Sequence, residues 1–198
     1  MRMLKPFVLL VIVFLAFALS ARADSTVVFN GSYSFAAGGY GIPPYGGTLD
    51  GNPAQFYCVD FSHGITANTS WSVTITSLSS SNLSSTFLKN QTEYLEMAWL
   101  ITQIMATPSN TAAGQQQIAE DQYAIWSLTG GPDPYGTDAS ILSQALQNIG
   151  SVNAQNFEIL TPTGSYGQEF MTTVPEPATI LMLGLGLLVV AFFARTRQ

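Results

Sequence analysis

The sequence predicts an α+β domain, a β-sandwich or barrel that carries a helical insertion or lid. Three observations lead to this prediction. Ser70 to Leu78 alternates apolar and polar residues, as a half-exposed antiparallel strand does. From 92 to 149 the apolar spacing changes to that of helices, and strand-like segments return at 157–160 and 168–173.

The N-terminal residues 1–23 have the pattern of a secretory signal peptide. Arg2 and Lys5 precede an almost wholly apolar run, and Ala21-Arg22-Ala23 supplies small residues for cleavage. We therefore expect the exported domain to span residues 24–173.

The C-terminal residues 174–198 form a second special segment. Residues 178–194 are apolar and uncharged, which is just long enough for a transmembrane helix, and Arg195 and Arg197 follow as a basic tail that should stay cytoplasmic. Together with Pro175, Glu176 and Pro177 immediately before the helix, this order resembles the PEP-CTERM sorting signal of Gram-negative bacteria. The resemblance implies an exported protein, held in the membrane by its C-terminal helix until an exosortase-type enzyme processes it. The mature protein would then belong to the cell surface or extracellular matrix.

The predicted strands follow from local patterns. Short alternation around Asn30-Gly31 predicts a hairpin over 25–36, and the Gly- and Pro-rich residues 38–51 predict a loop. Gln55 to Phe61 is the next expected strand, and in Ser70 to Leu78 the buried face should carry Trp71, Val73 and Ile75.

Three helices are expected between the strands, after a flexible Ser-rich connection at 77–85. The first, Thr92 to Met105, should bury a stripe of Leu95, Ala98, Trp99, Thr102 and Met105. The second spans Ala113 to Leu128, and the third runs from Asp138 as its cap to Gly150.

The charge of the exported part argues against whole classes of function. Between 24 and 177 the chain has twelve acidic residues and one basic residue, Lys89, which is a net charge of −11. Such a surface cannot displace counterions from phosphates, so we expect no nucleic-acid partner. One Cys and one His offer no metal-ligand spacing, and no cofactor is expected.

The single cysteine and one glutamine occupy unusual positions. Cys58 lies in the strand-like run FYCVDF, where both faces are apolar, and a lone cysteine cannot form an internal disulfide. In the second helix Gln122 shares one face with Ile118, Ile125 and Trp126. A buried amide there needs either hydrogen-bond partners or a chemical use.

Such a thiol and amide can react with each other. The thiolate attacks the Gln122 carbonyl and expels ammonia, which leaves an internal thioester and needs no cofactor, provided that the site is well positioned and dry. The motifs Tyr57-Cys58-Val59-Asp60 and Gln122-Tyr123-Ala124-Ile125-Trp126 resemble those of the thioester domains of bacterial surface adhesins. The resemblance implies a Cys58–Gln122 cross-link, with Tyr57, Asp60 and Trp126 in support, that captures an amine on a partner. This is one event per molecule, so the protein would not be an enzyme.

Three alternatives remain open at this stage. Cys58 can be a small buried apolar residue. It can form a nucleophilic pair with His63, although a strand would put the two on opposite faces and no orienting acid is evident. The protein can also be a non-covalent structural or exopolysaccharide-associated envelope or biofilm component that stacks sugars on Tyr40, Tyr45 and Trp71.

Overall fold

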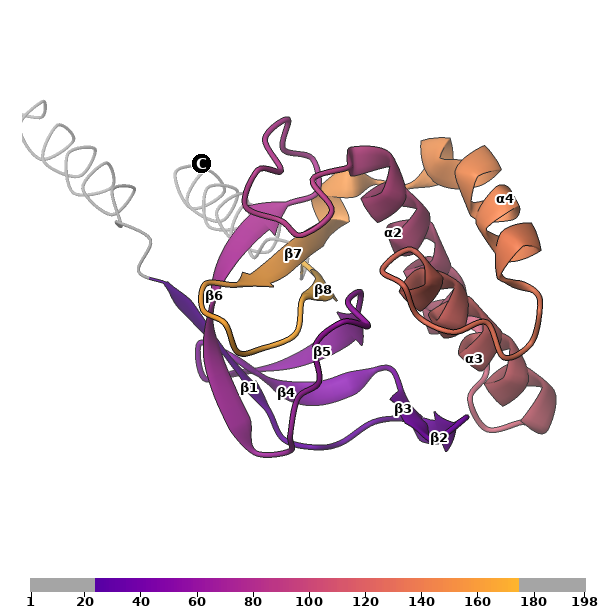
Figure 1. The fold of residues 1–198 in the computed structure, drawn as a ribbon, viewed down its shortest axis with the longest axis horizontal. Helices are drawn as coiled ribbons and strands as arrows, with labels where there is room; N and C mark the ends of the chain where they lie inside the picture. Colours follow the sequence, from indigo (N-terminus) through magenta and orange to yellow (C-terminus); the bar gives the residue numbers. More distant parts are fainter. Residues whose placement is uncertain (1–23, 175–198) are drawn as a thin grey trace, which may run out of the picture.

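The computed structural model describes residues 24–174 and shows a barrel with a helical layer on one side (Figure 1). Six described strands close the antiparallel barrel in the order β1-β4-β5-β8-β7-β6, so the α+β prediction is confirmed in its barrel form. The barrel strands are β1 (Ser25–Phe29), β4 (Tyr45–Leu49), β5 (Asn52–Cys58), β6 (Thr69–Ser77), β7 (Phe157–Pro162) and β8 (Phe170–Thr173).

The helices are inserted in the chain between β6 and β7. They are α2 (Gln91–Ala106), α3 (Ala112–Ser127) and α4 (Asp138–Asn148), followed by the short 3-10 turns η1 (Ile149–Ser151) and η2 (Ala154–Asn156). The expected signal peptide at 1–23 and the expected membrane helix at 178–194 lie outside the described residues. Within 24–174, none of the helices has the length and apolar character that crossing a membrane requires.

The barrel and the helices share one apolar core. Phe56 of β5 stacks on Phe170 of β8 with 5.4 Å between ring centroids, and both are fully buried. In β6 the predicted alternation holds as far as Thr74. Ile75 is then half-buried and Thr76 is buried, with its hydroxyl 3.0 Å from that of Ser85.

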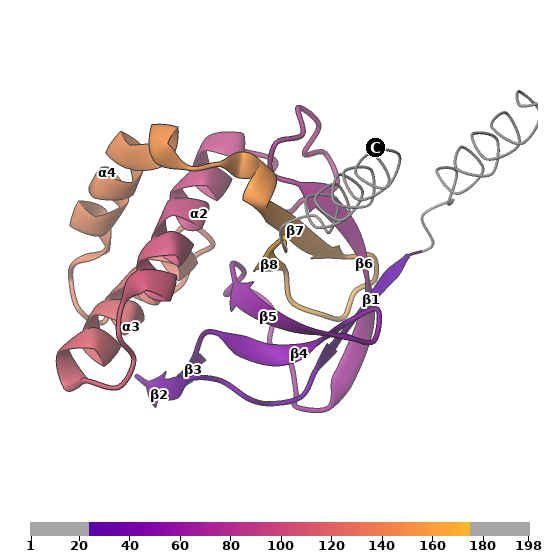
Figure 2. The same cartoon turned by 180° about the vertical axis from the view of Figure 1, so that it is seen from behind.

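The hairpin predicted around Asn30-Gly31 is wrong. β1 pairs with β4 and β6 instead of with the residues that follow it. The Asn30 side chain closes its own turn by accepting a 2.8 Å hydrogen bond from the Ser32 backbone N–H. The next residues form a separate two-stranded ribbon, β2 (Phe35–Ala37) with β3 (Tyr40–Ile42), which lies near the end of the helical layer (Figure 2).

The loop predicted for 38–51 is also wrong over most of its length, because it contains β3 and β4. The glycines of β4 reflect a close approach of two strands. A Cβ atom on Gly47 would lie 2.0 Å from the Val28 carbonyl oxygen of β1. Glycine here is therefore a packing requirement of the barrel and not a sign of a loop.

The helices begin close to their predicted residues. Asn90 caps α2 by accepting from the Thr92 N–H, and Thr111 caps α3 by accepting from the Gly114 N–H. The cap of α4 is Thr137, so Asp138 is its first helical residue.

The buried face predicted for α2 is wrong except at Ala98. Met105 is 55% exposed, and the fully buried side consists of Tyr94, Met97, Ala98, Leu100 and Ile101. Because α2 contacts both α3 and α4, it is apolar on several sides, and its spacing does not single out one stripe.

Candidate functional site

Cys58 is the last residue of β5, where the barrel meets the helical layer. It pairs with Phe170 of β8 and is 1% exposed. Its Sγ donates to the Asp60 carbonyl oxygen at 3.2 Å and accepts from the Trp126 indole Nε1–H at 3.1 Å. The thiol is therefore held between its own strand end and α3.

Gln122 lies in α3 one turn before Trp126 and is fully buried. Its side-chain Nε2 donates to the Cys58 carbonyl oxygen at 2.8 Å, while its Oε1 is buried without a hydrogen-bond partner. The fold thus brings Cys58 and Gln122, 64 residues apart in the chain, into direct contact.

The environment keeps the thiol protonated. Burial raises the pKa of Cys58 to about 12, and the nearby carboxyl groups of Asp60 and Glu169 act in the same direction. The Trp126 N–H opposes this by favouring charge on the sulfur. Any reaction of this thiol must therefore move its proton to another atom of the site.

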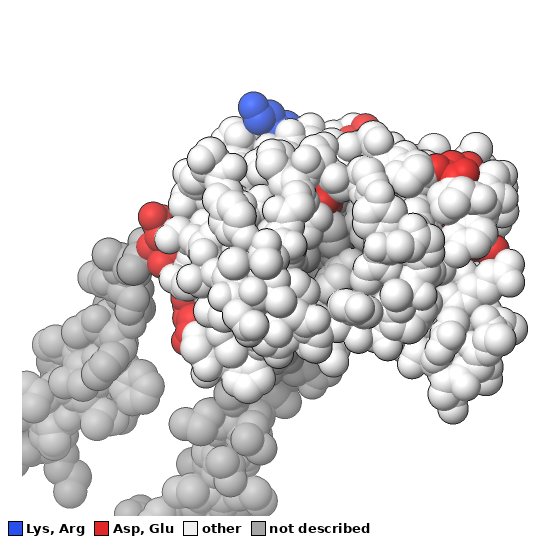
Figure 3. All heavy atoms as spheres, turned by 60° about the horizontal axis from the view of Figure 1, so that its bottom comes forward, with Lys and Arg blue, Asp and Glu red and all other residues white. Residues whose placement is uncertain are grey.

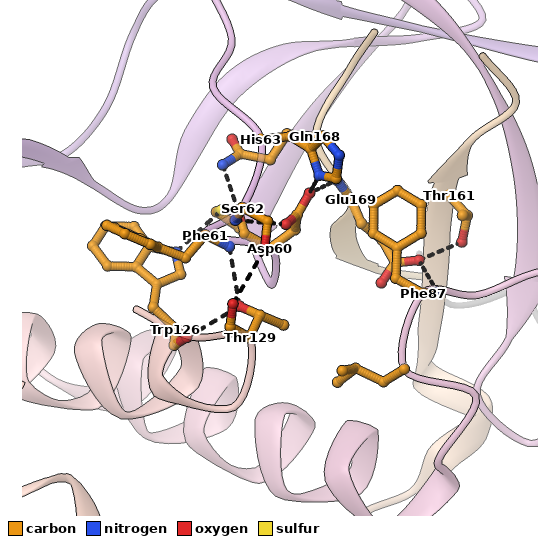
Figure 4. Close-up of polar contacts among 12 residues, drawn as sticks. Asp60, Phe61, Ser62, His63, Phe87, Trp126, Thr129, Thr161, Gln168 and Glu169 are labelled. Carbon is orange, nitrogen blue, oxygen red and sulfur yellow. Dashed lines mark hydrogen bonds and ion pairs between the residues drawn. The ribbon is translucent and has the colours of Figure 1, made fainter. Parts of the chain in front are cut away.

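Asp60 organises the turn that follows Cys58 (Figure 4). Its buried carboxylate accepts from the Ser62 backbone N–H at 2.8 Å and lies 2.7 Å from Nδ1 of His63. Its carbonyl oxygen, which holds the thiol, also accepts from Nε2 of Gln168 at 2.6 Å. Asp60 therefore fixes both the turn and the acceptor of the Cys58 hydrogen bond.

The expectation that His63 has no orienting acid is wrong, because Asp60 supplies one. The hydrogen bonds of the Cys58 thiol nevertheless go to Asp60 and Trp126 and not to His63. His63 instead packs against Phe87, with 5.3 Å between ring centroids.

The end of α3 is tied to the same turn. The Phe61 backbone N–H donates to Thr129 Oγ1 at 3.0 Å, and that hydroxyl donates to the Trp126 carbonyl at 3.0 Å (Figure 4). These bonds help to hold the indole N–H of Trp126 against the Cys58 sulfur.

Tyr57 lies apart from this contact. It is buried next to Cys58 in β5, and successive strand residues point to opposite faces. Tyr57 lines a separate cavity of about 250 Å³ with Ile104 and Ile118. Its contribution to the Cys58 site is therefore to the strand and not to the reacting groups.

Sequence reasoning missed Glu169, the buried acid beside Asp60. Its carboxylate accepts from the Tyr94 hydroxyl at 2.5 Å, the Thr161 hydroxyl at 2.6 Å and the Phe87 backbone N–H at 3.0 Å. Burial raises its pKa. No local pattern marks this residue, because two of its three donors, Phe87 and Tyr94, lie more than 70 residues away in the chain.

A pocket of about 450 Å³ borders Trp126. His63 and Gln168 also border it, and Gln168 shares the Asp60 carbonyl with the thiol. Cys58 is not one of the lining residues, but Trp126 lines the pocket and also donates to the Cys58 sulfur. The aromatic wall is formed by Phe29, Tyr33, Tyr40, Tyr45, Phe61 and Trp126.

Comparisons with known proteins identify a sorting motif and one distantly similar solved structure. Residues 173–198 match the model of the PEP-CTERM protein-sorting motif. The chain therefore carries a signal for export, envelope anchoring and subsequent processing by exosortase. Its Pro175, Glu176 and Pro177 and its basic Arg195 and Arg197 lie beyond the described residues.

Among solved structures, the chain is similar to the N-terminal thioester domain of a surface protein from Clostridium perfringens. The identity is 12%, the alignment covers 76% of this chain and 98% of that chain, and the TM-score is 0.40. The search of curated proteins finds no match.

Proposed function

We propose that this protein is an exported surface protein that captures a partner covalently through an internal thioester between Cys58 and Gln122. The observation that supports this most is the 2.8 Å hydrogen bond from Gln122 Nε2 to the Cys58 carbonyl. It holds the buried amide against the backbone of the residue that carries the buried thiol, and the amide oxygen has no hydrogen-bond partner among the described residues.

The thioester would form by exchange of one bond for another. The Cys58 sulfur bonds to Cδ of Gln122, the Cδ–Nε2 bond breaks, and ammonia leaves with the thiol proton. Amides are poor electrophiles, so the reaction depends on the fixed contact and on the exclusion of water. Both groups are at most 1% exposed, which meets the second condition.

Capture of a partner would break the thioester again. A primary amine attacks the thioester carbonyl, the C–S bond breaks, and a proton from the amine returns to sulfur. The Trp126 N–H, 3.1 Å from the sulfur, stabilises the charge that develops on it. The partner ends on Gln122 as an amide, and each molecule reacts once, so the protein does not turn over.

The aromatic pocket beside Trp126 is the route that we propose for the amine. A protonated amine is attracted to aromatic faces and to a protein with a net charge of −11 between 24 and 177. Lys89 is the sole lysine of that range, so few amines of the chain compete with the partner. The face in Figure 3 accordingly carries scattered acidic patches and a single basic one.

The sorting motif indicates an exported protein. We propose that it works at the cell surface or in the biofilm matrix of a Gram-negative bacterium, and that its partner is an amine-bearing molecule of that surface or matrix. The alternative is a non-covalent envelope protein. The same Gln122–Cys58 contact favours it, because a buried amide can simply join α3 to the barrel.

Two substitutions separate these functions. In Cys58→Ala and in Gln122→Ala, covalent labelling by a fluorescent primary amine should be lost. A maleimide should label the denatured Gln122→Ala protein at Cys58 but leave the denatured wild type unlabelled. If the denatured wild type carries a reactive thiol and captures no amine, the non-covalent function is the correct one.

A further inference from the structure

A polar pocket of about 400 Å³ lies between α2, α3 and α4, away from Cys58. It borders Asp121, the residue directly before Gln122, and successive helix residues are turned by about 100°. While Gln122 contacts the barrel, Asp121 therefore lines a cavity in the helical layer.

Asp121 is an unusual residue for a closed interior. It is 3% exposed, and its Oδ1 accepts from Nε2 of Gln117 at 2.9 Å. Its Oδ2 is buried and has no partner. The hydroxyl of Thr137, at the start of α4, lines the same pocket and is also buried without a partner. Two hydrogen-bonding groups in one pocket thus lack partners within residues 24–174.

The rest of the lining determines which ligand chemistry fits. Gln103, Gln117 and Gln144 offer amides that both donate and accept, and Trp99 adds an aromatic border. The amide N–H groups donate hydrogen bonds, and a metal cation cannot accept them. The volume also falls in the range of small-molecule sites. Among the described residues no Lys, Arg or His lines the pocket, while Glu120 and Asp121 do, so anionic ligands are disfavoured.

We propose that this pocket binds a neutral pyranose sugar unit. Its hydroxyls donate to Asp121 Oδ2 and exchange hydrogen bonds with Thr137 and the glutamine amides, and its apolar ring face lies toward Trp99. The site is independent of the thioester, so it would hold a glycan whether or not Cys58 and Gln122 react.

Saturation-transfer NMR on the exported protein tests the proposal, with glucose, N-acetylglucosamine and glucuronate as probes. One or both neutral sugars should show saturable binding, and glucuronate should not. Asp121→Asn should weaken binding roughly ten-fold or more, because a charge-assisted acceptor is lost. Gln144→Ala, at an exposed rim position, provides a second test that does not disturb the buried acid.

Two controls define specificity. Gln147, an exposed residue of α4, does not line the pocket, and Gln147→Ala should bind the sugar like the wild type. Cys58→Ala should also bind normally, which separates this site from the proposed thioester. The proposal is overturned if no neutral sugar binds, if glucuronate binds equally well, or if Asp121→Asn and Gln144→Ala both leave binding unchanged. It is also overturned if Ca²⁺ alone raises the melting temperature in an Asp121-dependent way.

Discussion

The two sides of α3 carry neighbouring buried polar residues in opposite surroundings. Gln122 faces the barrel, where it contacts Cys58 and lies one turn from Trp126. Asp121 faces a pocket of amides and hydroxyls between the helices. Each residue leaves one side-chain oxygen buried without a partner.

The difference lies in what can reach those oxygens. On the barrel side Gln122 and Cys58 are both at most 1% exposed, so a ligand has no access to the amide oxygen. On the outer side there is space for a ligand with its own donors. A single helix can thus present two chemically distinct sites, because the side chains of successive residues point in different directions around the helix axis.

The largest expected effect is on the barrel side. Trp126→Ala removes a side chain that is 3% exposed and should lower the free energy of unfolding by about 3–5 kcal/mol. Trp126→Phe keeps most of the packing but removes the N–H donor to Cys58, so it should cost less and slow amine capture. Urea unfolding measures the loss of stability in both variants. If Trp126→Ala costs no more than Gln144→Ala, at an exposed rim position, the barrel side is not tightly packed.

Asp121, on the other side of α3, should make the free energy of unfolding depend on pH. Burial raises the pKa of Asp121 from 3.8 to about 6. The folded state therefore binds the proton more tightly than the unfolded state, and the free energy of unfolding falls as pH rises between these two values. The charged carboxyl lowers stability at pH 7 by up to about 3 kcal/mol.

Asp121→Asn should then be more stable than the wild type at pH 7 and similar to it near pH 4, as measured by urea unfolding. Some pH dependence should persist, because burial also raises the pKa of Asp138 to about 6. Equal destabilisation of the variant at both pH values would contradict the assignment. Stabilisation with lost sugar binding would support a site that is retained for its ligand.

The smallest effect concerns the ribbon beside the barrel side of α3. The Tyr123 hydroxyl donates to the Ala37 carbonyl at 3.1 Å and joins α3 to β2. Tyr123→Phe should cost about 0.5–1.5 kcal/mol and increase amide hydrogen exchange mainly in residues 35–42. Uniform exchange across the whole domain would show that this bond is not a local tie.

The site was partly readable in the sequence because α3 has a regular apolar stripe. Ile118, Ile125 and Trp126 surround Gln122 at helical spacing, so its burial could be expected from local pattern. The two motifs also suggested Cys58 as its neighbour. The contact itself depends on how the helix packs against the barrel, which spacing does not specify.

Other features depend on contacts between distant segments and left no local signal. β4 was missed because its glycines fit the close approach to β1, and such glycines look like a loop in the sequence. Glu169 was missed because its three donors lie at 87, 94 and 161. The pocket beside Asp121 was missed for the same reason, since three helices form it.

The central claim is that Cys58 and Gln122 form a thioester, and the intact mass of the exported wild-type protein tests it most directly. The account predicts a mass lower by one ammonia than the processed sequence requires. After incubation with methylamine the mass should rise by one methylamine, and Cys58 should become open to alkylation once the protein is denatured. A full mass that methylamine does not change, with one alkylatable thiol in the untreated denatured protein, would contradict it.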